Sequence, residues 1–505
     1  MSVTREVALL LAVMSASLLG CGSRSPEPDP IAAKSPPKGQ SETAPIKPAA
    51  RPKETTRKPP IVEQPAVAPI APPRTEPAKT AIAYRPSYPL RPLSTLKLQD
   101  AGLSVETLDS FRLVTDLPEE KLRPLVSLFR DATPTWTRYF NELPPARDKS
   151  PFHATGYVMA DRNVFTKAGL FPDTVPLSYH GRQIGAEFWM NDQTRDYYRS
   201  HLLLHEATHI YMRHLGGESD YLPYWYLEGM AELIATHERD ADGSLRLSVM
   251  PADRDRFLGW ERIVLVQRDC AGRGVRSIDE ITKLNADDFT RVESYAWCWA
   301  LCRFLDSHPR YQSEFRRIAR TLAANPFDAV FREFHRQHAQ ELDAEWLLFA
   351  TNIEYGFDFE RAVIEFSDGK PLIGQSRSVE VVADRGWQSS GFLVESGQKY
   401  RVEANGQFTL ADKPRPWVSE ANGVSLRYTK GQPLGRLLGC VRLSGSSEQA
   451  ARGMLDLIPL GNVTEFTPEL SGTLYLRLND AWSELADNKG LVTATLGIVA
   501  DDEQK

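Results

Sequence analysis

The 505-residue chain lacks a strong net charge and a hydrophobic run long enough to cross a membrane. Its formal net charge is −6, so no basic excess indicates binding to nucleic acid. The apolar run near the N-terminus, Val7 to Gly20, is shorter than the roughly 20 residues that a transmembrane helix needs. Cysteine is also scarce, with five in the whole chain. We therefore expect a chain of two or three domains without a nucleic-acid partner.

The N-terminal segment has the pattern of a bacterial export signal. Arg5 precedes the apolar run, which ends in Leu-Leu-Gly-Cys at residues 18–21. This ending resembles a bacterial lipobox, which implies a signal peptide over residues 1–20 and a lipid on Cys21. The chain would then be exported and anchored to a bacterial membrane, in the periplasm or at the cell surface. A simple secretory signal is the alternative, in which Cys21 is an ordinary residue near the cleavage site.

A proline-rich segment follows, over residues 21–96. It holds eighteen of the 36 prolines, interleaved with Lys, Glu, Ala and Thr. Such a composition cannot bury an apolar core. We predict an extended, largely disordered tether between the anchor and the first folded domain.

The stretch His-Leu-Leu-Leu-His-Glu-Ala-Thr-His, residues 201–209, contains an HExxH motif. It lacks Gly and Pro and predicts a helix, on which His205 and His209 share one face, one turn apart. Two imidazoles so placed can occupy adjacent corners of a zinc tetrahedron. Glu206 lies about 100° further round the helix, within reach of a water beside the metal. The motif predicts a zinc site, and a chance match on a buried helix is the alternative.

A catalytic zinc needs a third protein ligand and one open position. Downstream, Leu222 to Glu238 predicts a second helix with an apolar stripe. Glu228 lies within that stripe, where a carboxylate needs a partner or a metal, and Glu232 lies one turn further on the same face. Gly229 and Ala231 remove bulk, so we expect this helix to pack closely on the histidine helix. The alternative is a surface helix whose glutamates are solvated.

The two segments together resemble the gluzincin metallopeptidases. HExxH is followed after eighteen residues by a glutamate in an E-G-x-A-E context, which is the ligand spacing of the aminopeptidase N family. The pattern also resembles thermolysin, more distantly, and a family of uncharacterised exported bacterial proteins. The resemblance covers residues 181–305. It implies His205, His209 and Glu228 as zinc ligands, Glu206 as general base, and Glu232 as the carboxylate that orients a ligand histidine.

A later helical segment, Glu293 to Leu305, carries a candidate proton donor. In gluzincins a tyrosine from a later helix often hydrogen-bonds the oxyanion of the tetrahedral intermediate. The resemblance makes Tyr295 that candidate. The alternative is a core aromatic residue whose hydroxyl is satisfied within the protein.

An apolar run upstream of the motif, Gln183 to Met190, predicts a strand. In gluzincins an edge strand commonly lies above the zinc and pairs with an extended substrate. Glu187 occupies the place of the glutamate in the G-A-M-E-N segment of aminopeptidase N relatives, although little else in the segment agrees. We favour a core strand over an amine-recognition site.

The pattern changes at Lys370. Residues 97–370 are mainly helical, with a mixed opening that leads into the zinc helices. Short runs of alternating polarity, separated by Gly, Asn and Asp, then predict an all-β sandwich over residues 371–505. The predicted fold class is α+β: a thermolysin-like, mainly helical zincin domain followed by a β-sandwich. We expect the two domains to have separate cores.

The C-terminal stretch from Tyr475 to Val499 resembles the tail of calcium-dependent galactose-binding lectins of the bacterial lectin A type. That resemblance implies a calcium ion that also holds sugar hydroxyls, with oxygen ligands from Asn479, Asp480, Asp487 and Asn488. Asp-Asn-Lys-Gly is also a good hairpin turn, and we favour the turn over the calcium site.

Four cysteines remain if Cys21 is lipidated. In an oxidising compartment we expect Cys270 to pair with Cys298 or Cys302. We expect Cys440, in the β domain, to be a lone buried residue.

These features predict a membrane-anchored, exported zinc metallopeptidase that hydrolyses peptide bonds with Glu206 as general base. Its partners would be a peptide or protein substrate, the membrane through the lipid anchor, and a glycan at the C-terminal domain. The alternative is a catalytically inactive surface binding protein that attaches to carbohydrate or cell wall through the lectin-like domain. The intact ligand set and the intact base favour the enzyme.

Overall fold

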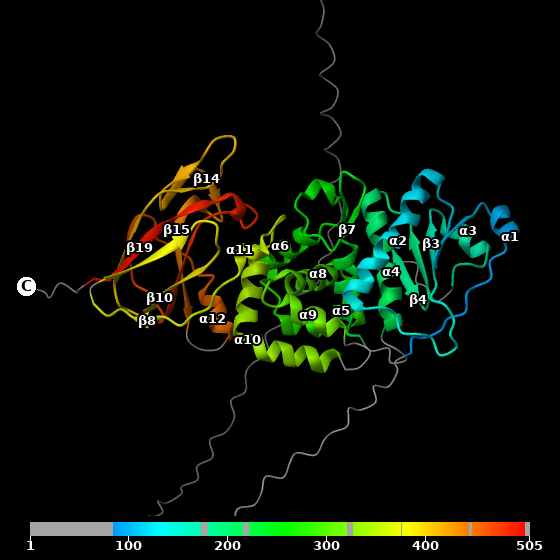
Figure 1. Ribbon diagram of the computed structural model, residues 1–505, viewed down its shortest axis with the longest axis horizontal. Coiled ribbons are helices and arrows are strands. Elements are labelled where there is room, and N and C mark those ends of the chain that lie inside the picture. The colour runs from blue at the N-terminus through cyan, green and yellow to red at the C-terminus, as the bar shows by residue number, and fades with distance from the viewer. Residues whose placement is uncertain are drawn as a thin grey trace, which may run out of the picture. The chain divides into compact units, whose positions relative to one another are not determined.

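The computed structural model describes residues 84–172, 180–215, 222–320, 327–374, 376–443 and 447–499. These residues form a mixed α+β fold, with helices in the central region and β-sheets toward the C-terminus (Figure 1), which confirms the predicted fold class. The predicted signal peptide, the lipidation site Cys21 and most of the proline-rich segment lie outside the described residues. Among the described helices, none is both long and apolar enough to cross a membrane.

A five-stranded sheet opens the folded region, in the order β1-β2-β3-β5-β4. Its three inner strands run parallel to one another, and the two edge strands run antiparallel to their neighbours. The central strand is buried along its whole length. The strand bounds are β1 (Ser104–Leu108), β2 (Phe111–Thr115), β3 (Ala154–Met159), β4 (Gly181–Ile184) and β5 (Glu187–Asn191).

The predicted single strand from Gln183 to Met190 is wrong, because the chain turns back within it. Gly185 and Ala186 separate β4 from β5, and the two strands pair antiparallel. Gly185 adopts a φ of 61°, which favours glycine. The turn makes β4 the edge strand of the sheet.

The histidine helix is packed between the sheet and other helices. α4 (Asp196–Leu215) contacts β3, β4 and β5 as well as α2 (Glu119–Phe140) and α5 (Tyr224–Ala235). α2 begins with Glu119 and Glu120, and acidic residues suit the first turn of a helix. Its fully buried Trp136 donates a hydrogen bond from Nε1 to the hydroxyl of Thr208 on α4, at 2.9 Å. These contacts fix α4 from several sides.

Shorter elements and a second group of helices complete this region. The remaining elements before Lys370 are α1 (Thr95–Asp100), α3 (Arg162–Lys167), β6 (His237–Arg239), β7 (Leu245–Leu247), α6 (Arg262–Arg273), α7 (Ile278–Thr282), α8 (Val292–Ser307), α9 (Gln312–Arg320), α10 (Phe327–Asn352) and α11 (Phe359–Ala362).

Gly229 serves a different helix contact from the predicted one. A Cβ atom there would lie 2.6 Å from the backbone oxygen of Cys298 and 2.6 Å from Sγ of Cys302, both on α8. The missing side chain at Gly229 therefore lets α5 approach α8. The predicted packing of α5 on the histidine helix α4 is also present. The helix α5 contacts both α4 and α8.

The C-terminal region contains two β-sheets. The first has the order β14-β15-β18-β10-β8 with β16 beside β15, and the second has the order β13-β12-β19-β11-β17 with β9 beside β19. Their bounds are β8 (Lys370–Pro371), β9 (Ser376–Val382), β10 (Gln388–Val394), β11 (Tyr400–Asn405), β12 (Phe408–Thr409), β13 (Val418–Ser419), β14 (Asn422–Thr429), β15 (Gln432–Leu443), β16 (Ile458–Pro459), β17 (Val463–Phe466), β18 (Gly472–Leu478) and β19 (Lys489–Ile498). A short helix, α12 (Ser447–Gly453), follows β15.

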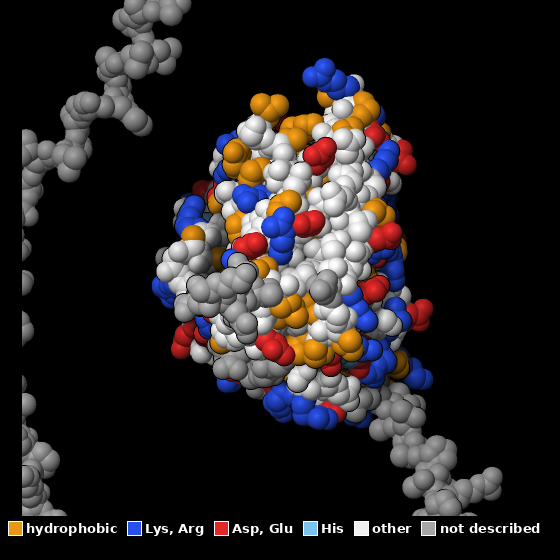
Figure 2. Space-filling model, turned by 90° about the vertical axis from the view of Figure 1, so that its left-hand side faces the viewer, with side chains coloured by type: hydrophobic (Ala, Val, Ile, Leu, Met, Phe, Trp, Pro, Cys, Tyr) orange, Lys and Arg blue, Asp and Glu red, His pale blue; other side chains and the backbone are white. Residues whose placement is uncertain are grey.

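The sandwich buries residues of both sheets in one apolar core, which includes Val402, Phe408, Leu474 and Val492. Burial alternates along β11, as the period of two predicts. On the face of the molecule shown in Figure 2, basic, acidic and apolar side chains are interspersed.

A second apolar core crosses the predicted boundary at Lys370. Trp482 of the sandwich stacks on Phe357, with ring centroids 5.6 Å apart. Tyr475 belongs to the same core cluster, and its hydroxyl accepts a hydrogen bond from the backbone N–H of Ser367. The helical region and the sandwich therefore share buried surface, in addition to the core within the sandwich.

The end of the predicted tether is packed against the folded region. Arg85 forms a parallel β-bridge with Ala146, and Nη2 of Arg91 lies 3.0 Å from Oε2 of Glu187. The chain is thus held from about residue 84 onward, twelve residues before the predicted end of the tether.

The predicted disulfide is wrong. The four cysteines after Cys21 are all free thiols in the part of the chain that the structure describes. Cys298 and Cys302 are buried against α5, and the Cys270 thiol instead donates a hydrogen bond to the backbone oxygen of Ala350. Cys440 is free and buried, as predicted.

Candidate metal centre

His205 and His209 lie one turn apart on α4 and point their Nε2 atoms at the same place. These two atoms are 3.0 Å apart, and both rings are almost fully buried. α4 has no Gly or Pro in this stretch and is packed on several sides, so the two rings are held in one orientation.

Glu228, on α5, completes a group of three. Its Oε2 lies 3.3 Å from Nε2 of His205 and 3.2 Å from Nε2 of His209. Zinc ligands about 2.0 to 2.1 Å from a tetrahedral ion are about 3.3 Å from one another, so the three separations fit one ion. The three residues form a candidate metal site, and the two-nitrogen, one-oxygen donor set suits zinc.

The charges of the three groups fit the same role. Burial raises the pKa of the Glu228 carboxyl, but the charges and hydrogen bonds of His209 and His205 outweigh burial and lower it below its usual range. Glu228 is therefore an anion at neutral pH, which is the form that binds a cation.

Glu206 lies on the same helix and is also buried. Burial raises the pKa of its carboxyl to about 7, against a smaller opposing effect of His205. A carboxylate with a pKa near neutral can both accept and donate a proton. The β4 strand passes close to it, because a Cβ atom at Gly181 would lie 2.2 Å from Oε1 of Glu206.

Tyr295 lies beside the histidines, on α8. Its ring centroid is 6.2 Å from that of His205 and 5.1 Å from that of Phe289. Burial raises the Tyr295 pKa well above its usual value, and the nearby Glu228 and Glu206 carboxylates raise it further. Its hydroxyl therefore keeps its proton at neutral pH and can donate a hydrogen bond.

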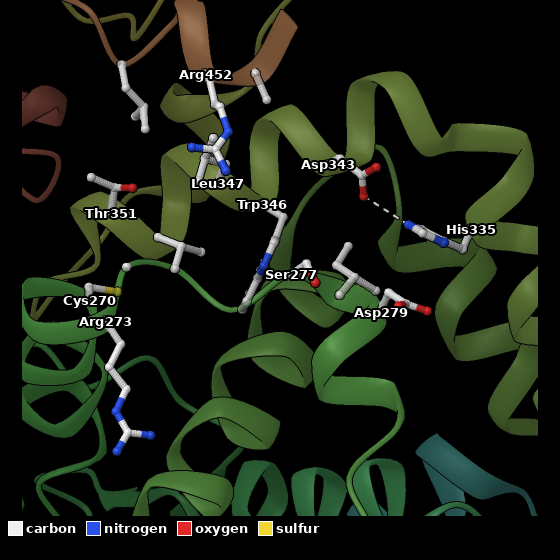
Figure 3. Close-up of a pocket in the computed structure, with 15 residues that line it drawn as sticks. Cys270, Arg273, Ser277, Asp279, His335, Asp343, Trp346, Leu347, Thr351 and Arg452 are labelled. Carbon is white, nitrogen blue, oxygen red and sulfur yellow. Dashed lines mark hydrogen bonds and ion pairs between the residues drawn. The ribbon is translucent and has the colours of Figure 1, made fainter. Parts of the chain in front are cut away.

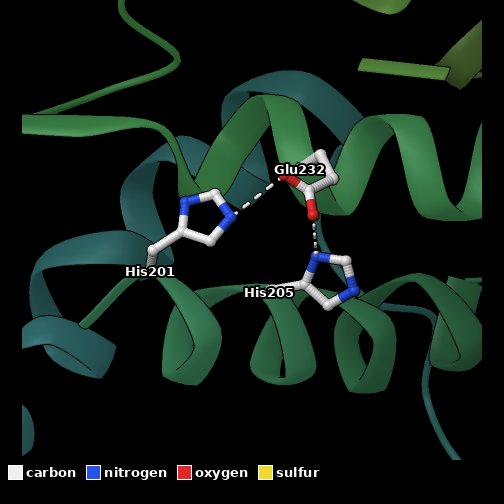
Figure 4. Close-up of side chains that lie close together, drawn as sticks. All are labelled: His201, His205 and Glu232. Carbon is white, nitrogen blue, oxygen red and sulfur yellow. Dashed lines mark hydrogen bonds and ion pairs between the residues drawn. The ribbon is translucent and has the colours of Figure 1, made fainter. Parts of the chain in front are cut away.

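Glu232 does not join the three converging residues and instead lies behind His205. Its Oε1 is 3.6 Å from Nδ1 of His205 (Figure 4), whereas Glu228 faces the other ring nitrogen, Nε2. Burial raises the pKa of Glu232, but Arg262, His201 and His205 together outweigh burial and keep the pKa well below its usual value. Glu232 is thus an anion beside the nitrogen of His205 that does not face the candidate site.

Three residues around Glu232 were not found by sequence reasoning. His201 lies one turn before His205 on α4, and the spacing of His201, His205 and His209 at four residues could have indicated it. Trp260 and Arg262 approach Glu232 from the start of α6. They lie about thirty residues further along the chain, and no local pattern marks them.

Glu187 does not have a free carboxylate. Arg91 binds it through Nε at 3.2 Å and Nη2 at 3.0 Å, and the Tyr157 hydroxyl donates to Oε1 at 2.6 Å. Its charge is thus neutralised within the protein, which agrees with a core strand and not with an amine-recognition site.

The candidate calcium residues are only partly brought together. Nδ2 of Asn488 donates to Oδ2 of Asp480 at 2.9 Å, and both side chains are buried. Oδ1 of Asn488 is buried without a hydrogen-bond partner among the described residues. Asn479 uses its amide group to bind three backbone oxygens around the β14–β15 turn, and Asp487 is exposed. The Asp480–Asn488 pair is the part of the predicted cluster that the structure assembles.

The Asp-Asn-Lys-Gly segment is not a hairpin turn between two strands. It continues from the short 3₁₀ helix η3 (Leu485–Asp487) directly into β19, whose first residue is Lys489. The predicted hairpin is therefore wrong.

A cavity of about 640 Å³ lies away from the converging histidines (Figure 3). It is lined by residues of α6, α7, α10 and α12, among them Cys270, Trp346 and Arg452. None of His205, His209 and Glu228 lines it, so this cavity is not part of the candidate metal site.

Comparison with known proteins gives no family for the chain: no protein-family model and no curated protein matches it. Among solved structures, a PllA-like lectin, the EclA N-terminal domain, is 18% identical over 24% of this chain and 95% of the lectin, with a TM-score of 0.19. The IMPa metallopeptidase from Pseudomonas aeruginosa is 12% identical over 77% of this chain, with a TM-score of 0.14. The match spans only 46% of that metallopeptidase. These TM-scores are too low to assign a fold or a function, so the function has to be inferred from the residues of this chain.

Proposed function

We propose that this chain is a zinc metallopeptidase, in which His205, His209 and Glu228 hold the metal. The observation that carries the proposal is the convergence of the two Nε2 atoms and the Glu228 oxygen within 3.3 Å of one another. Glu206 is buried on the same helix turn, where a general base is needed.

The reaction is the hydrolysis of a peptide bond. When bound, zinc supplies a Lewis acid that acidifies water and polarises the scissile carbonyl. Glu206 takes the proton from the attacking water and delivers it to the leaving amine. Tyr295 donates its hydroxyl proton in a hydrogen bond to the oxyanion, since its raised pKa keeps the hydroxyl protonated.

The substrate binds in an extended form along β4. Among the described residues β4 pairs only with β5, so its other edge has no strand partner there. An extended peptide can hydrogen-bond to such an edge through its main chain. Since Gly181 of β4 approaches Glu206, a peptide on this edge runs beside the general base.

We also propose, from the sequence alone, that the chain is exported and held to a bacterial membrane by a lipid on Cys21. The sandwich would then bring the enzyme to a glycan. Replacing Cys21 with serine should move the protein from the membrane fraction to the soluble fraction. A wild-type protein that is already soluble, with a mature N-terminus at another residue, contradicts this part of the proposal.

The runner-up is a surface binding protein without catalytic activity. One observation favours it: Asp480 and Asn488 form a buried pair in the lectin-like tail, with an unpaired amide oxygen. The two functions differ in what Glu206 does, because a binding protein does not need a general base.

Metal content and peptide cleavage test the proposed function together. The wild-type chain should hold one zinc ion, measured by elemental analysis, and should cleave members of a mixed peptide library. His205→Ala, His209→Ala and Glu228→Ala should each lose the metal. Glu206→Gln should keep the metal and lose cleavage.

His214→Gln is the matched control, since His214 is a buried histidine on the same helix outside the site. It should keep both metal and cleavage. A Glu228→Ala protein with full zinc occupancy would overturn the ligand assignment. Zinc binding without cleavage of any peptide would favour the binding protein.

A further inference from the structure

Glu232 is surrounded by hydrogen-bond donors from α4, from the first residue of α6 and from the loop just before α6. His201 approaches its Oε2 with Nε2 at 3.1 Å, and Trp260 donates to the same oxygen through Nε1 at 3.3 Å. Arg262 binds both carboxylate oxygens, with Nε 3.1 Å from Oε2 and Nη2 2.8 Å from Oε1. All four side chains are buried. The position of the carboxylate is therefore fixed by its surroundings.

His205 connects this group to the candidate metal site. Its Nδ1 faces Oε1 of Glu232 at 3.6 Å, and its Nε2 faces Glu228 and His209. A carboxylate behind the outer nitrogen of a ligand histidine fixes the ring orientation and keeps the other nitrogen free of its proton for the metal. A displacement of Glu232 therefore changes the orientation of the His205 ring, and with it the position of Nε2.

His201, His205 and Glu232 are also close enough to one another to hold an ion themselves (Figure 4). Arg262 argues against that use. Its guanidinium already occupies both oxygens of Glu232, and a divalent cation would have to enter a buried site beside a fixed positive charge. The group therefore acts on the neighbouring site and is not a second one.

We propose that Arg262 and His201 are positioning residues for the metal site and act through Glu232 on His205. This inference rests on the proposed function, because it needs a metal held by His205. Loss of either donor leaves a buried carboxylate with a missing partner, which then shifts toward its remaining donors. Without either donor, Glu232 no longer holds the His205 ring in its orientation, and the affinity of the site for the metal falls.

The experiment compares zinc affinity in full-length variants, by competition with a chromophoric chelator. Arg262→Lys keeps the positive charge but cannot bind both oxygens, and His201→Leu removes the donor. Each should bind zinc about 10- to 100-fold more weakly than the wild type. His201→Gln should bind zinc almost as tightly as the wild type, since a glutamine amide can donate to the same oxygen of Glu232. The visible absorption of the cobalt(II)-loaded variants should also change, because it reports the geometry around the metal.

Arg303→Lys is the matched control. Arg303 is a buried arginine on α8 that bonds to Ser307 and Ser248 and does not contact Glu232. Its zinc affinity and cobalt spectrum should stay at the wild-type values. The melting temperature of each variant in excess chelator shows whether it is folded before metal is added.

Folded Arg262→Lys and His201→Leu proteins with wild-type zinc affinity and cobalt spectrum would overturn the inference. So would a wild-type chain that takes two zinc ions, with the second lost in His201→Leu. Failure of the proposed function looks different: the wild type then binds no zinc, or binds it equally well after His209→Ala.

Discussion

A Cβ atom at Gly181 would lie 2.2 Å from Oε1 of Glu206. Any side chain at this position therefore competes with the carboxylate for the same space. Gly181 lies on β4, and Glu206 lies on α4, so the contact fixes the distance between the edge strand and the general base. The glycine is needed for this close approach.

Gly181→Ala should lower peptide cleavage by about 10- to 100-fold while zinc binding stays unchanged. The methyl group displaces the Glu206 carboxylate, which can swing aside because it ends a flexible side chain. The fold is retained, and His205 and His209 keep their positions. Cleavage rate and zinc content of the same preparation provide the measurement.

Gly272→Ala is the control for that substitution. Gly272 lies within α6, and a Cβ atom there would have open space around it. Alanine should leave cleavage unchanged and stabilise the helix slightly. Equal cleavage by Gly181→Ala and the wild type would mean that the close approach of β4 to Glu206 does not affect the reaction.

The parts of the candidate site that depend on local spacing could be predicted from the sequence. His205, His209 and Glu206 follow from helical periodicity, and Glu228 follows from its motif. The approach of Gly181 to Glu206 could not be predicted, because it depends on how the sheet packs on α4. Arg262 was missed for the same reason, since its contact with Glu232 joins two helices about thirty residues apart.

In the fold, too, local patterns could be predicted from the sequence and tertiary contacts could not. The helix α2 and the alternating strands of the sandwich were predictable because their patterns repeat over many residues. The hairpin at Gly185 was not, since the glycine sits inside a largely apolar run, between Ile184 and Ala186, that looks like one strand. The core shared by Phe357 and Trp482 could not be predicted from a local sequence pattern either, because the two residues are more than a hundred positions apart in the chain.

Tyr295→Phe should lower kcat by about 10- to 1,000-fold with little change in KM. The substitution removes only the hydroxyl, so the ring keeps its packing against His205 and Phe289. Zinc content should stay at the wild-type value. Steady-state kinetics on one peptide give both constants, and an unchanged kcat would make Tyr295 a core aromatic residue.

The stability of the fold should fall at acidic pH because of two buried histidines. Burial lowers the pKa of His214 and of His237 to about 4 each, with Arg85 and Arg239 among the smaller causes. An unfolded histidine titrates near pH 6.5, so between about pH 6.5 and 4 the unfolded chain binds more protons than the folded one. The free energy of unfolding therefore falls as the pH drops through this window, by up to about 3 kcal/mol per histidine.

Urea unfolding at a series of pH values from 4 to 7 measures this effect. His214→Phe and His237→Phe should each flatten the pH dependence relative to the wild type, because phenylalanine has no proton to gain. The difference between wild type and variant removes the contribution of all other groups. An identical slope in all three proteins would show that these histidines are protonated equally in the folded and unfolded chain.

The last prediction separates a calcium site from a buried hydrogen-bonded pair without a metal at Asp480 and Asn488. If the pair binds calcium, the melting temperature of the full-length chain should rise by a few degrees with millimolar calcium, since a ligand of the native state stabilises it. Asp480→Asn should abolish the rise, and Asp368→Asn, at an exposed position, should not. Burial raises the pKa of Asp480 to about 6, so a proton competes with the cation below that pH. The rise should therefore be larger at pH 7 than at pH 5. A melting curve that calcium leaves unchanged at both pH values would leave Asp480 and Asn488 as a buried hydrogen-bonded pair that only shapes the entry to β19.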